Sequence, residues 1–338
     1  MPVNKILLSI VIPTYNRNAR LNETLALLLP QLTPVCELLI LDNASTIPVS
    51  ETSAEVLEGY PDVRICRHRT NIGADANICR CVEYATGEFV WVLGDDDHIL
   101  RDSVRIALES IREFPHVTAI NFSTEMCMRS EQTICRGVKD FIGKIDSFAN
   151  ILFISASVLH AERLRSRLRY AYHLIYSMAP LVAALLMTLE EDGVAVLSHR
   201  QIIGWGEPGE ETHWSTVDQA LGRMLLLELP LTTPMRRILA ARIAITPREV
   251  VTLAYKLTGR ALLSGDPKSS LFVYNQIRQR AGLYSRRLDL KITLMLSRLP
   301  VRFPRLGLKW FMLASRLTGL PRRESMEKLL LAIRSSRR

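Results

Sequence analysis

The chain has 338 residues, a hydrophobic fraction of 48% and a formal net charge of +9 at pH 7. This length accommodates one large α/β domain with an appendage, or two domains, and the apolar content suffices for a sizeable core. The six cysteines lack the paired spacing of a zinc site, which indicates reduced, mostly buried thiols of a cytoplasmic protein. The first apolar run, residues 6–12, is too short for a secretory leader.

The charge is distributed unevenly along the chain. Residues 235–338 contain 23 Lys and Arg against 5 Asp and Glu, whereas residues 1–234 contain 20 against 29. An acidic body followed by a basic third implies different partners for the two parts. We expect two domains, residues 1–215 and residues 216–338, because the pattern becomes helical from residue 216 onward.

Short apolar runs alternate with segments of helical spacing in the first part of the chain. Runs of aliphatic residues predict strands buried on both faces, at residues 7–12, 37–41, 63–66, 89–93 and 117–122. Helical spacing predicts helices over residues 22–32 and 103–114. A further helix is expected to follow the segment 71–77, to run through residue 84 and to have Gly87 as its C-cap. Residues 150–159 are expected to form a strand and a turn. This alternation predicts an α/β fold with a mostly parallel, doubly wound sheet flanked by helices.

Polar residues follow three of the predicted strands. The segment Pro13-Thr14-Tyr15 follows the first, Asp42 follows the second, and residues 95–97 are three consecutive aspartates after the fourth. In such sheets, ligands bind at the carboxyl ends of the strands. Three adjacent carboxylates repel one another, and their hard oxygens suit Mg²⁺ or Mn²⁺. The alternative for residues 95–97 is a solvated acidic turn, but the coincidence of three polar strand ends favours a ligand site.

Several common enzyme motifs do not occur in the sequence. No G-x-G-x-x-G follows the first predicted strand, and there is no G-x-x-x-x-G-K-[ST] and no G-x-S-x-G. These observations argue against a dinucleotide dehydrogenase, a P-loop NTPase and a serine hydrolase of the α/β-hydrolase type.

Four segments in order resemble family 2 glycosyltransferases of the GT-A fold. They are SIVIPTYNR at residues 9–17, LILDNAS at 39–45, NIG at 71–73 and GEFVWVLGDDD at 87–97. The last segment looks most like bacterial enzymes of O-antigen or exopolysaccharide synthesis, although Gly94 stands where many relatives have Asp. The resemblance implies a GT-A catalytic domain at residues 1–215.

The resemblance also implies roles for individual residues. Nucleotide-sugar binding is implied for eight of them: Pro13, Thr14, Tyr15, Asn16, Asp42, Asn71, Gly73 and Asp95. Metal binding is implied for Asp96 and Asp97, and Asp97 is also a candidate catalytic residue. Tyr15 would stack on the base, with an ordinary strand-end aromatic as the alternative. For Asp42 the alternative is an Asx-turn cap.

An inverting transferase needs a general base near the acceptor hydroxyl. His173 is our candidate, with Glu190, Glu191 and Asp192 as runners-up and a purely structural histidine as the alternative. The uncharged run of residues 170–189 is interpreted as a segment with a buried helix starting near Pro180, rather than as a membrane span. The loop of residues 204–211 is interpreted either as a lid over the donor or as a linker.

From residue 216 onward the pattern is helical and basic. Amphipathic segments cover residues 238–245, 250–263, 270–280, 288–299, 306–317 and 324–333, separated by proline or glycine. The basic faces suit the anionic inner leaflet of a plasma membrane or contacts between copies of the chain. Nucleic acid is ranked lower as a partner, because few aromatics are interleaved with the basic residues.

The resemblance therefore implies a metal-dependent, inverting hexosyl- or deoxyhexosyltransferase of bacterial surface polysaccharide synthesis. It would move a sugar from a nucleoside diphosphate sugar to a glycan or a polyprenyl-diphosphate-linked glycan, with Mn²⁺ or Mg²⁺ as cofactor. The enzyme is expected in the cytoplasm, at the inner face of the plasma membrane. The rival interpretations are a sugar-nucleotide nucleotidyltransferase and a catalytically inactive scaffold that binds a partner protein.

Overall fold

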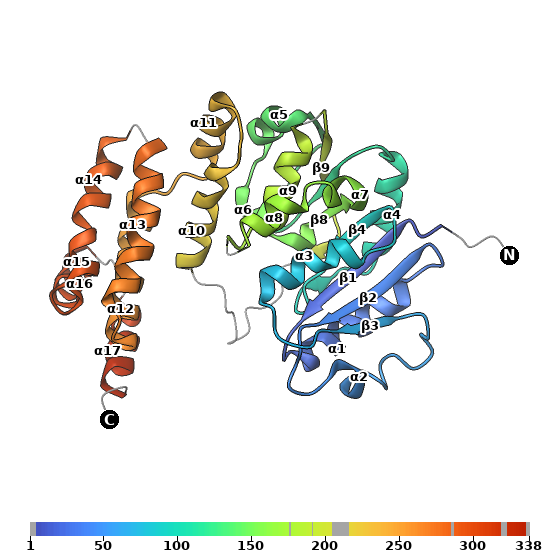
Figure 1. The fold of residues 1–338 in the computed structure, drawn as a ribbon, viewed down its shortest axis with the longest axis horizontal. Coiled ribbons are helices and arrows are strands. Elements are labelled where there is room, and N and C mark those ends of the chain that lie inside the picture. Colours follow the sequence, from blue (N-terminus) through green and yellow to red (C-terminus); the bar gives the residue numbers. More distant parts are fainter. Residues whose placement is uncertain are drawn as a thin grey trace. The chain divides into compact units, whose positions relative to one another are not determined.

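The computed structural model describes residues 5–175, 177–190, 192–204, 216–284, 287–318 and 323–335. The chain divides into two compact units, Met1–Glu211 and Thr212–Arg338. The first unit is a mixed α/β structure and the second is helical (Figure 1).

An eight-stranded sheet forms the centre of the first unit, in the order β3-β2-β1-β4-β8-β6-β9-β7. The strands are β1 (Leu8–Thr14), β2 (Cys36–Asp42), β3 (Arg64–Arg67), β4 (Phe89–Val92), β6 (Ala119–Ser123), β7 (Thr133–Arg136), β8 (Ser157–His160) and β9 (Val194–Gln201). Only β7 and β8 run opposite to the other strands of this sheet. A separate antiparallel pair is formed by β5 (His98–Ile99) and β10 (Ile203–Gly204). The prediction of a mostly parallel sheet flanked by helices is confirmed.

Helices cover both faces of the sheet (Figure 1). They are α1 (Asn18–Leu28), α2 (Val49–Thr52), α3 (Ala74–Tyr84), α4 (Ser103–Glu113), α5 (Gly137–Lys144), α6 (Phe148–Leu152), α7 (Ala161–Arg165), α8 (Leu168–His173) and α9 (Pro180–Leu189). Helices α1 and α4 contribute to one core cluster with β1, β2 and β4. Helix α3 packs against β1 and β4 and also contacts α7, α8 and α9.

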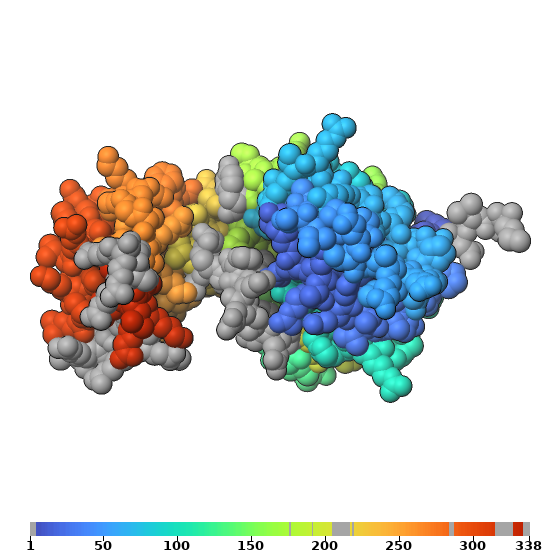
Figure 2. Space-filling view, turned by 90° about the horizontal axis from the view of Figure 1, so that it is seen from below, coloured from blue at the N-terminus to red at the C-terminus, as the bar shows by residue number. Residues whose placement is uncertain are grey.

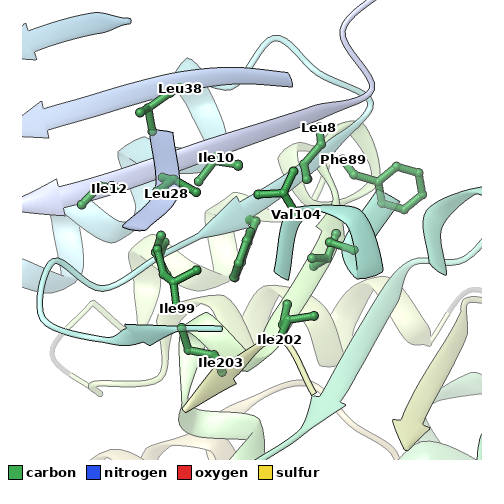
Figure 3. Close-up of a cluster of buried hydrophobic side chains, with 14 of the residues drawn as sticks. Leu8, Ile10, Ile12, Leu28, Leu38, Phe89, Ile99, Val104, Ile202 and Ile203 are labelled. Carbon is green, nitrogen blue, oxygen red and sulfur yellow. The ribbon is translucent and has the colours of Figure 1, made fainter. Parts of the chain in front are cut away.

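The core beneath α1 and α4 follows from the alternation of side chains along β1. Leu8, Ile10 and Ile12 point to the same face of the strand, because successive strand residues point to opposite faces. All three are fully buried, together with Leu28 of α1 and Val104 of α4 (Figure 3). Burial of these aliphatic side chains fixes the register of β1 and thereby the position of its carboxyl end.

Two local expectations were wrong. Helix α3 ends at Tyr84 with Ala85 as its cap, so Gly87 is not a helix cap. The Gly87 amide instead donates to Ser9 Oγ over 2.7 Å, and a Cβ at this position would lie 2.8 Å from that oxygen.

Residues 150–159 do not begin as a strand either, since α6 and a 3₁₀ turn precede β8. The Ser147 hydroxyl caps α6, which accounts for its start.

Helix α9 is the buried helix expected within residues 170–189. Every residue of α9 is buried, and Pro180 occupies its first turn, where a missing amide hydrogen costs no helical bond. Its neighbours within the unit include α3, α5, α7 and α8. Among the described helices, none has the length and apolarity needed to cross a membrane.

The second unit contains eight helices within its described residues. They are α10 (Thr216–Leu225), α11 (Thr233–Arg242), α12 (Pro247–Ser264), α13 (Pro267–Tyr284), α14 (Leu288–Leu296), α15 (Arg298–Arg302), α16 (Pro304–Thr318) and α17 (Arg323–Ser335). The single helix expected over residues 288–299 was wrong: it divides at Ser297 into α14 and α15. Pro300, which we took as a separator, lies inside the short α15, where its missing amide hydrogen prevents a continuous helix through this point.

Candidate active site

The carboxyl ends of β1, β2 and β4 meet at one edge of the sheet. The register pairs Thr14 with Asp42, and β4 runs parallel to β1 on its other side. The Thr14 hydroxyl donates to Asp95 Oδ2 over 2.6 Å, across the gap between the ends of β1 and β4. The structure thus brings together three of the sequence-predicted site residues.

Asp95 and Asp96 share one cationic nitrogen. Arg17 Nη1 lies 3.1 Å from Asp95 Oδ1 and 2.7 Å from Asp96 Oδ2. Burial raises the pKa of Asp95 to about 6, although the hydrogen bond from Thr14 and the charge of Arg17 both lower it. Sequence reasoning gave Arg17 no role, although it closes the first family-like segment. The available signal for Arg17 was its position: it is a basic residue just beyond the end of a strand, at the sheet edge that carries an acidic motif.

Asp97 makes a different contact from its two neighbours. Its carboxylate accepts a hydrogen bond from Ser155 Oγ, and that oxygen in turn accepts one from the Gly94 amide over 2.8 Å. Trp91 Nε1 donates to the Ser155 carbonyl over 2.8 Å. Burial raises the pKa of Asp97 to about 7, and the charges of Asp96 and Asp95 add to this effect. Ser155 is therefore a site residue that the sequence did not reveal.

Gly94 is required by the position of the Asp97 carboxylate. A Cβ atom built on Gly94 would collide with Asp97 Oδ2 and Cγ. Any larger residue at this position would push the carboxylate away from Ser155. The glycine at this position is therefore coupled to the placement of Asp97.

The predicted nucleotide loop is held by Asn43, another residue without a predicted role. Its Nδ2 donates to Asn71 Oδ1 over 2.9 Å and to the Gly73 carbonyl over 3.3 Å, and its Oδ1 accepts from the Ile72 amide over 2.9 Å. Gly73 has a φ of +88°, a conformation that favours glycine, directly before α3. Asn43 thus ties the loop to the end of β2.

Asp42 uses both carboxylate oxygens within the protein. Oδ1 accepts from the Ser45 amide over 2.8 Å, and Oδ2 lies 2.5 Å from Arg67 Nη1. Burial alone would raise the pKa of Asp42, but hydrogen bonds from Ser45, Arg67 and Val49 outweigh it and hold the pKa below its usual range. These contacts match the Asx-type cap that we considered as the alternative to a nucleotide contact.

Tyr15 and Asn16 lie just beyond the end of β1. The Tyr15 side chain is 42% exposed. Asn16 adopts a left-handed conformation with φ of 55°; its amide donates to Ser45 Oγ over 2.9 Å and its Oδ1 accepts from the Thr46 amide over 2.7 Å. Pro13 is still within β1, paired with Leu41. Asn16 therefore joins the loops after β1 and β2, and Tyr15 is accessible beside them.

The general-base candidates occupy two different places. His173 is the last residue of α8 and is exposed, on a helix that contacts α3 and α9. Glu190 and Asp192 follow the C-terminal end of α9, and Glu191 lies outside the described residues. Strand β9, which follows directly, is parallel to β6 and has the same direction as β4. Glu190 and Asp192 therefore lie at the sheet edge opposite to Asp95.

The donor set of the aspartate cluster fits a divalent cation. Carboxylate oxygens are the ligands that Mg²⁺ and Mn²⁺ prefer. Two carboxylates already converge on the cationic Arg17 Nη1, and the third belongs to the half-buried Asp97. Within the described part of the chain, however, no three His, Cys, Asp or Glu side chains are arranged as a metal site. Of the expected loop of residues 204–211, only residue 204 is among the described residues.

The sequence of residues 9–141 matches the family described as Glycosyl transferase family 2. These residues form a family 2 glycosyltransferase domain. They run from β1 into α5 and include the aspartate cluster, Arg17 and the loop of Asn71. The expected resemblance to family 2 glycosyltransferases is confirmed for residues 9–141.

Two curated relatives match part of this domain. Abequosyltransferase RfbV of Salmonella typhimurium is 36% identical over 104 residues, which cover 30% of this chain and 31% of the relative. The uncharacterized glycosyltransferase YibD of Escherichia coli is 33% identical over 92 residues, or 27% of this chain and 26% of the relative. The chain thus matches less than a third of the length of either relative.

Solved structures share the fold over most of the chain. Staphylococcus aureus TarS 1–349 in complex with UDP-GlcNAc superposes with a TM-score of 0.59 at 16% identity, covering 89% of this chain and 92% of TarS. Mannosyltransferase PcManGT of Pyrobaculum calidifontis, in complex with GDP-Man and Mn²⁺, gives a TM-score of 0.50 at 15% identity, with 99% and 87% covered. These similarities confirm the GT-A fold prediction.

Proposed function

We propose that this protein is a glycosyltransferase that uses a nucleoside diphosphate sugar as donor. The observation that carries the proposal is the aspartate cluster of residues 95–97, held at the carboxyl edge of a family 2 domain. The curated relatives are named as glycosyltransferases, and the two structural neighbours were solved with UDP-GlcNAc and GDP-Man. These names support the donor class.

Asp96 and Asp97 would hold a Mn²⁺ or Mg²⁺ ion, and Asp95 would approach the ribose or the sugar of the donor. When bound, such an ion offsets the negative charge that develops on the leaving diphosphate. Arg17 forms ion pairs with Asp95 and Asp96, and Ser155 donates a hydrogen bond to Asp97. Tyr15 would stack on the base of the nucleotide, and Asn43 would keep the loop of Asn71 and Gly73 beside it.

The transfer would proceed with inversion at the anomeric carbon. The acceptor oxygen forms a bond to this carbon while the bond to the diphosphate oxygen breaks, and the diphosphate leaves with the electron pair. The proton of the acceptor hydroxyl passes to a general base. His173 remains our candidate for this base, at the exposed end of α8.

The acceptor that we propose is a glycan or a polyprenyl-diphosphate-linked glycan of a bacterial surface polysaccharide. Residues 1–215 would form the catalytic domain, and the basic residues 216–338 would face the inner leaflet of the plasma membrane or a second copy of the chain. The net positive charge of the C-terminal third supports a partner that carries negative charge.

A binding screen tests the donor assignment. Titration calorimetry with UDP, GDP, dTDP and CDP sugars in the presence of Mn²⁺ should show binding of at least one donor. Tyr15→Ala should weaken that binding by about 1–3 kcal/mol, by analogy with the stacking of bases on aromatic side chains. Ile47→Ala is the matched control, since Ile47 is a comparably exposed apolar residue. Unchanged affinity in Tyr15→Ala would remove the stacking role, and no binding of any donor would favour the inactive scaffold.

Product analysis distinguishes the rival enzyme. A glycosyltransferase releases a nucleoside diphosphate from its donor, whereas a nucleotidyltransferase releases or consumes pyrophosphate. Detection of pyrophosphate in place of nucleoside diphosphate would therefore contradict the proposal.

A further inference from the structure

Helix α14 is apolar on two opposite faces. Leu290 and Leu294 are buried, and α12, α13 and α15 pack against this helix. At about 100° per residue, Leu288, Ile292 and residues 295–296 lie on the other side. These residues are exposed, with exposed fractions between 45% and 70%. The outward face of α14 is therefore hydrophobic where a surface helix normally carries polar residues.

The same arrangement continues through α15 and α16. Phe311 and Val301 are buried, and α12 contacts both helices. On α16, Leu306, Trp310 and Leu313 recur at helical spacing and all three are exposed, with the Trp310 ring packed edge-on against the Phe311 ring. Large apolar side chains are exposed at nine positions in this segment: Leu288, Ile292, Met295, Leu296, Leu299, Phe303, Leu306, Trp310 and Leu313. We call these nine residues the apolar face; Figure 2 shows its helices in red-orange at the surface.

Basic side chains accompany the apolar face. Residues 288–318 contain six Lys and Arg and a single acidic residue, Asp289, which pairs with Arg287 over 2.6 Å. Lys291, Arg302, Arg305 and Lys309 are exposed in this segment. Long basic side chains beside apolar ones are typical of helices that lie in a membrane interface, with the apolar groups among the acyl chains and the charges at the headgroups.

We propose that the apolar face of α14 to α16 lies on an anionic lipid surface, with Trp310 and Phe303 inserted among the acyl chains just below the headgroups. The charge of the segment favours lipid over a neutral protein partner, because anionic headgroups complement the exposed basic side chains of this segment. This inference extends the membrane-facing role given above to residues 216–338. It does not depend on whether the catalytic domain transfers a sugar.

Vesicle binding of the full-length protein tests the proposal. At low salt the protein should sediment with vesicles of phosphatidylcholine and phosphatidylglycerol, but not with vesicles of phosphatidylcholine alone. Lipids brominated in their acyl chains should quench part of the tryptophan fluorescence. Trp310→Phe should remove this quenching while the protein still sediments. Sedimentation without quenching of Trp310 would overturn the insertion of this face.

Two pairs of variants locate the lipid contact. Phe303→Ser/Leu306→Ser should weaken vesicle binding about tenfold or more, and Arg302→Glu/Arg305→Glu should do the same and reduce the salt dependence. Leu263→Ser/Phe272→Ser is the matched control, because these side chains are comparably exposed but lie on α12 and α13. Circular dichroism establishes that the variants are folded. An equal loss of vesicle binding in the control pair would overturn the assignment. So would a protein that does not bind vesicles but forms a dimer that dissociates only in the Phe303→Ser/Leu306→Ser variant.

Discussion

At the scale of single residues, Gly94 and Arg17 determine how the aspartate cluster is arranged. Gly94 leaves the space that the Asp97 carboxylate fills, and Arg17 forms ion pairs with both Asp95 and Asp96. Neither residue acts as a ligand in our proposal. Both decide whether the carboxylates can occupy positions from which they reach one ion.

Replacing Gly94 by alanine should lower activity about a hundredfold without unfolding the protein. The added Cβ must displace the Asp97 carboxylate from Ser155, and a misplaced catalytic group commonly costs about a hundredfold in rate. Gly143→Ala is the control, since no atom lies within 4 Å of the corresponding Cβ in α5. Donor turnover and thermal unfolding of both variants would check this expectation. Wild-type turnover in Gly94→Ala would show that Asp97 need not occupy its observed position.

Removal of Arg17 should make the protein depend on a divalent cation for stability. In Arg17→Ala, Asp95 and Asp96 lose their shared positive charge, and breaking such a partly buried pair costs about 1–3 kcal/mol. Mn²⁺ should then raise the melting temperature of the variant more than that of the wild type. Arg20→Ala, at an exposed pair with Glu23, is the control. Equal Mn²⁺ effects in the variant and wild type would separate Arg17 from the metal site.

At the scale of elements, Asp75 joins the start of α3 to the segment before α9. The Met178 amide, in a residue with φ of 54°, donates to Asp75 Oδ2 over 3.1 Å. Burial raises the pKa of Asp75 to about 6, against the lowering effect of this hydrogen bond. Asp75 therefore ionises at a higher pH in the folded protein than in the unfolded chain.

This pKa shift predicts a pH-dependent effect of Asp75→Asn. Because the folded state holds the proton more tightly, the contribution of Asp75 to stability falls as the pH rises from about 4 through 6. Asparagine cannot ionise and retains an oxygen for the Met178 amide. The variant should be about 1 kcal/mol more stable than the wild type at pH 7.5, after allowing for partial solvent screening, and equally stable below pH 4. Denaturant titrations at both pH values measure this; a pH-independent difference would contradict it.

The start of α12 offers a test within the helical unit. Thr246 and Glu249 form a reciprocal capping box: Thr246 Oγ1 accepts from the Glu249 amide over 3.2 Å, and Glu249 Oε2 accepts from the Thr246 amide over 2.7 Å. Thr246→Ala should destabilise this unit by about 1 kcal/mol. Thr252→Ala, inside the same helix, should have little effect or stabilise it. Equal unfolding midpoints for the two variants would exclude a stabilising cap.

At the scale of the whole molecule, sequence patterns predicted the sheet better than the site. Continuous aliphatic runs identified β1, β2 and β4, because strands buried on both faces need apolar residues at every position. Strands β7 and β9 went unpredicted, since exposed or polar residues interrupt them, as at Ile134 and His199. The local pattern around Pro300 did not reveal the break between α14 and α15.

The candidate site was predicted only where its residues lie on motifs. The sequence predicts that three strand ends meet at one edge of the sheet. The structure places their residues Thr14, Asp42 and Asp95 at this edge. Arg17, Asn43 and Ser155 act through contacts between residues 28 to 79 positions apart in the sequence, which no local pattern encodes. His173 and the metal ligands remain predictions.

The measurement that tests the central claim most directly is the release of nucleoside diphosphate from the donor that binds. With Mn²⁺ present, we expect the wild type to release it, EDTA to stop the reaction and added Mn²⁺ to restore it. Asp96→Ala should be folded and inactive, whereas Asp62→Ala, at an exposed loop position, should retain wild-type activity. Release that persists in EDTA or in Asp96→Ala would contradict a metal-dependent glycosyl transfer at this cluster.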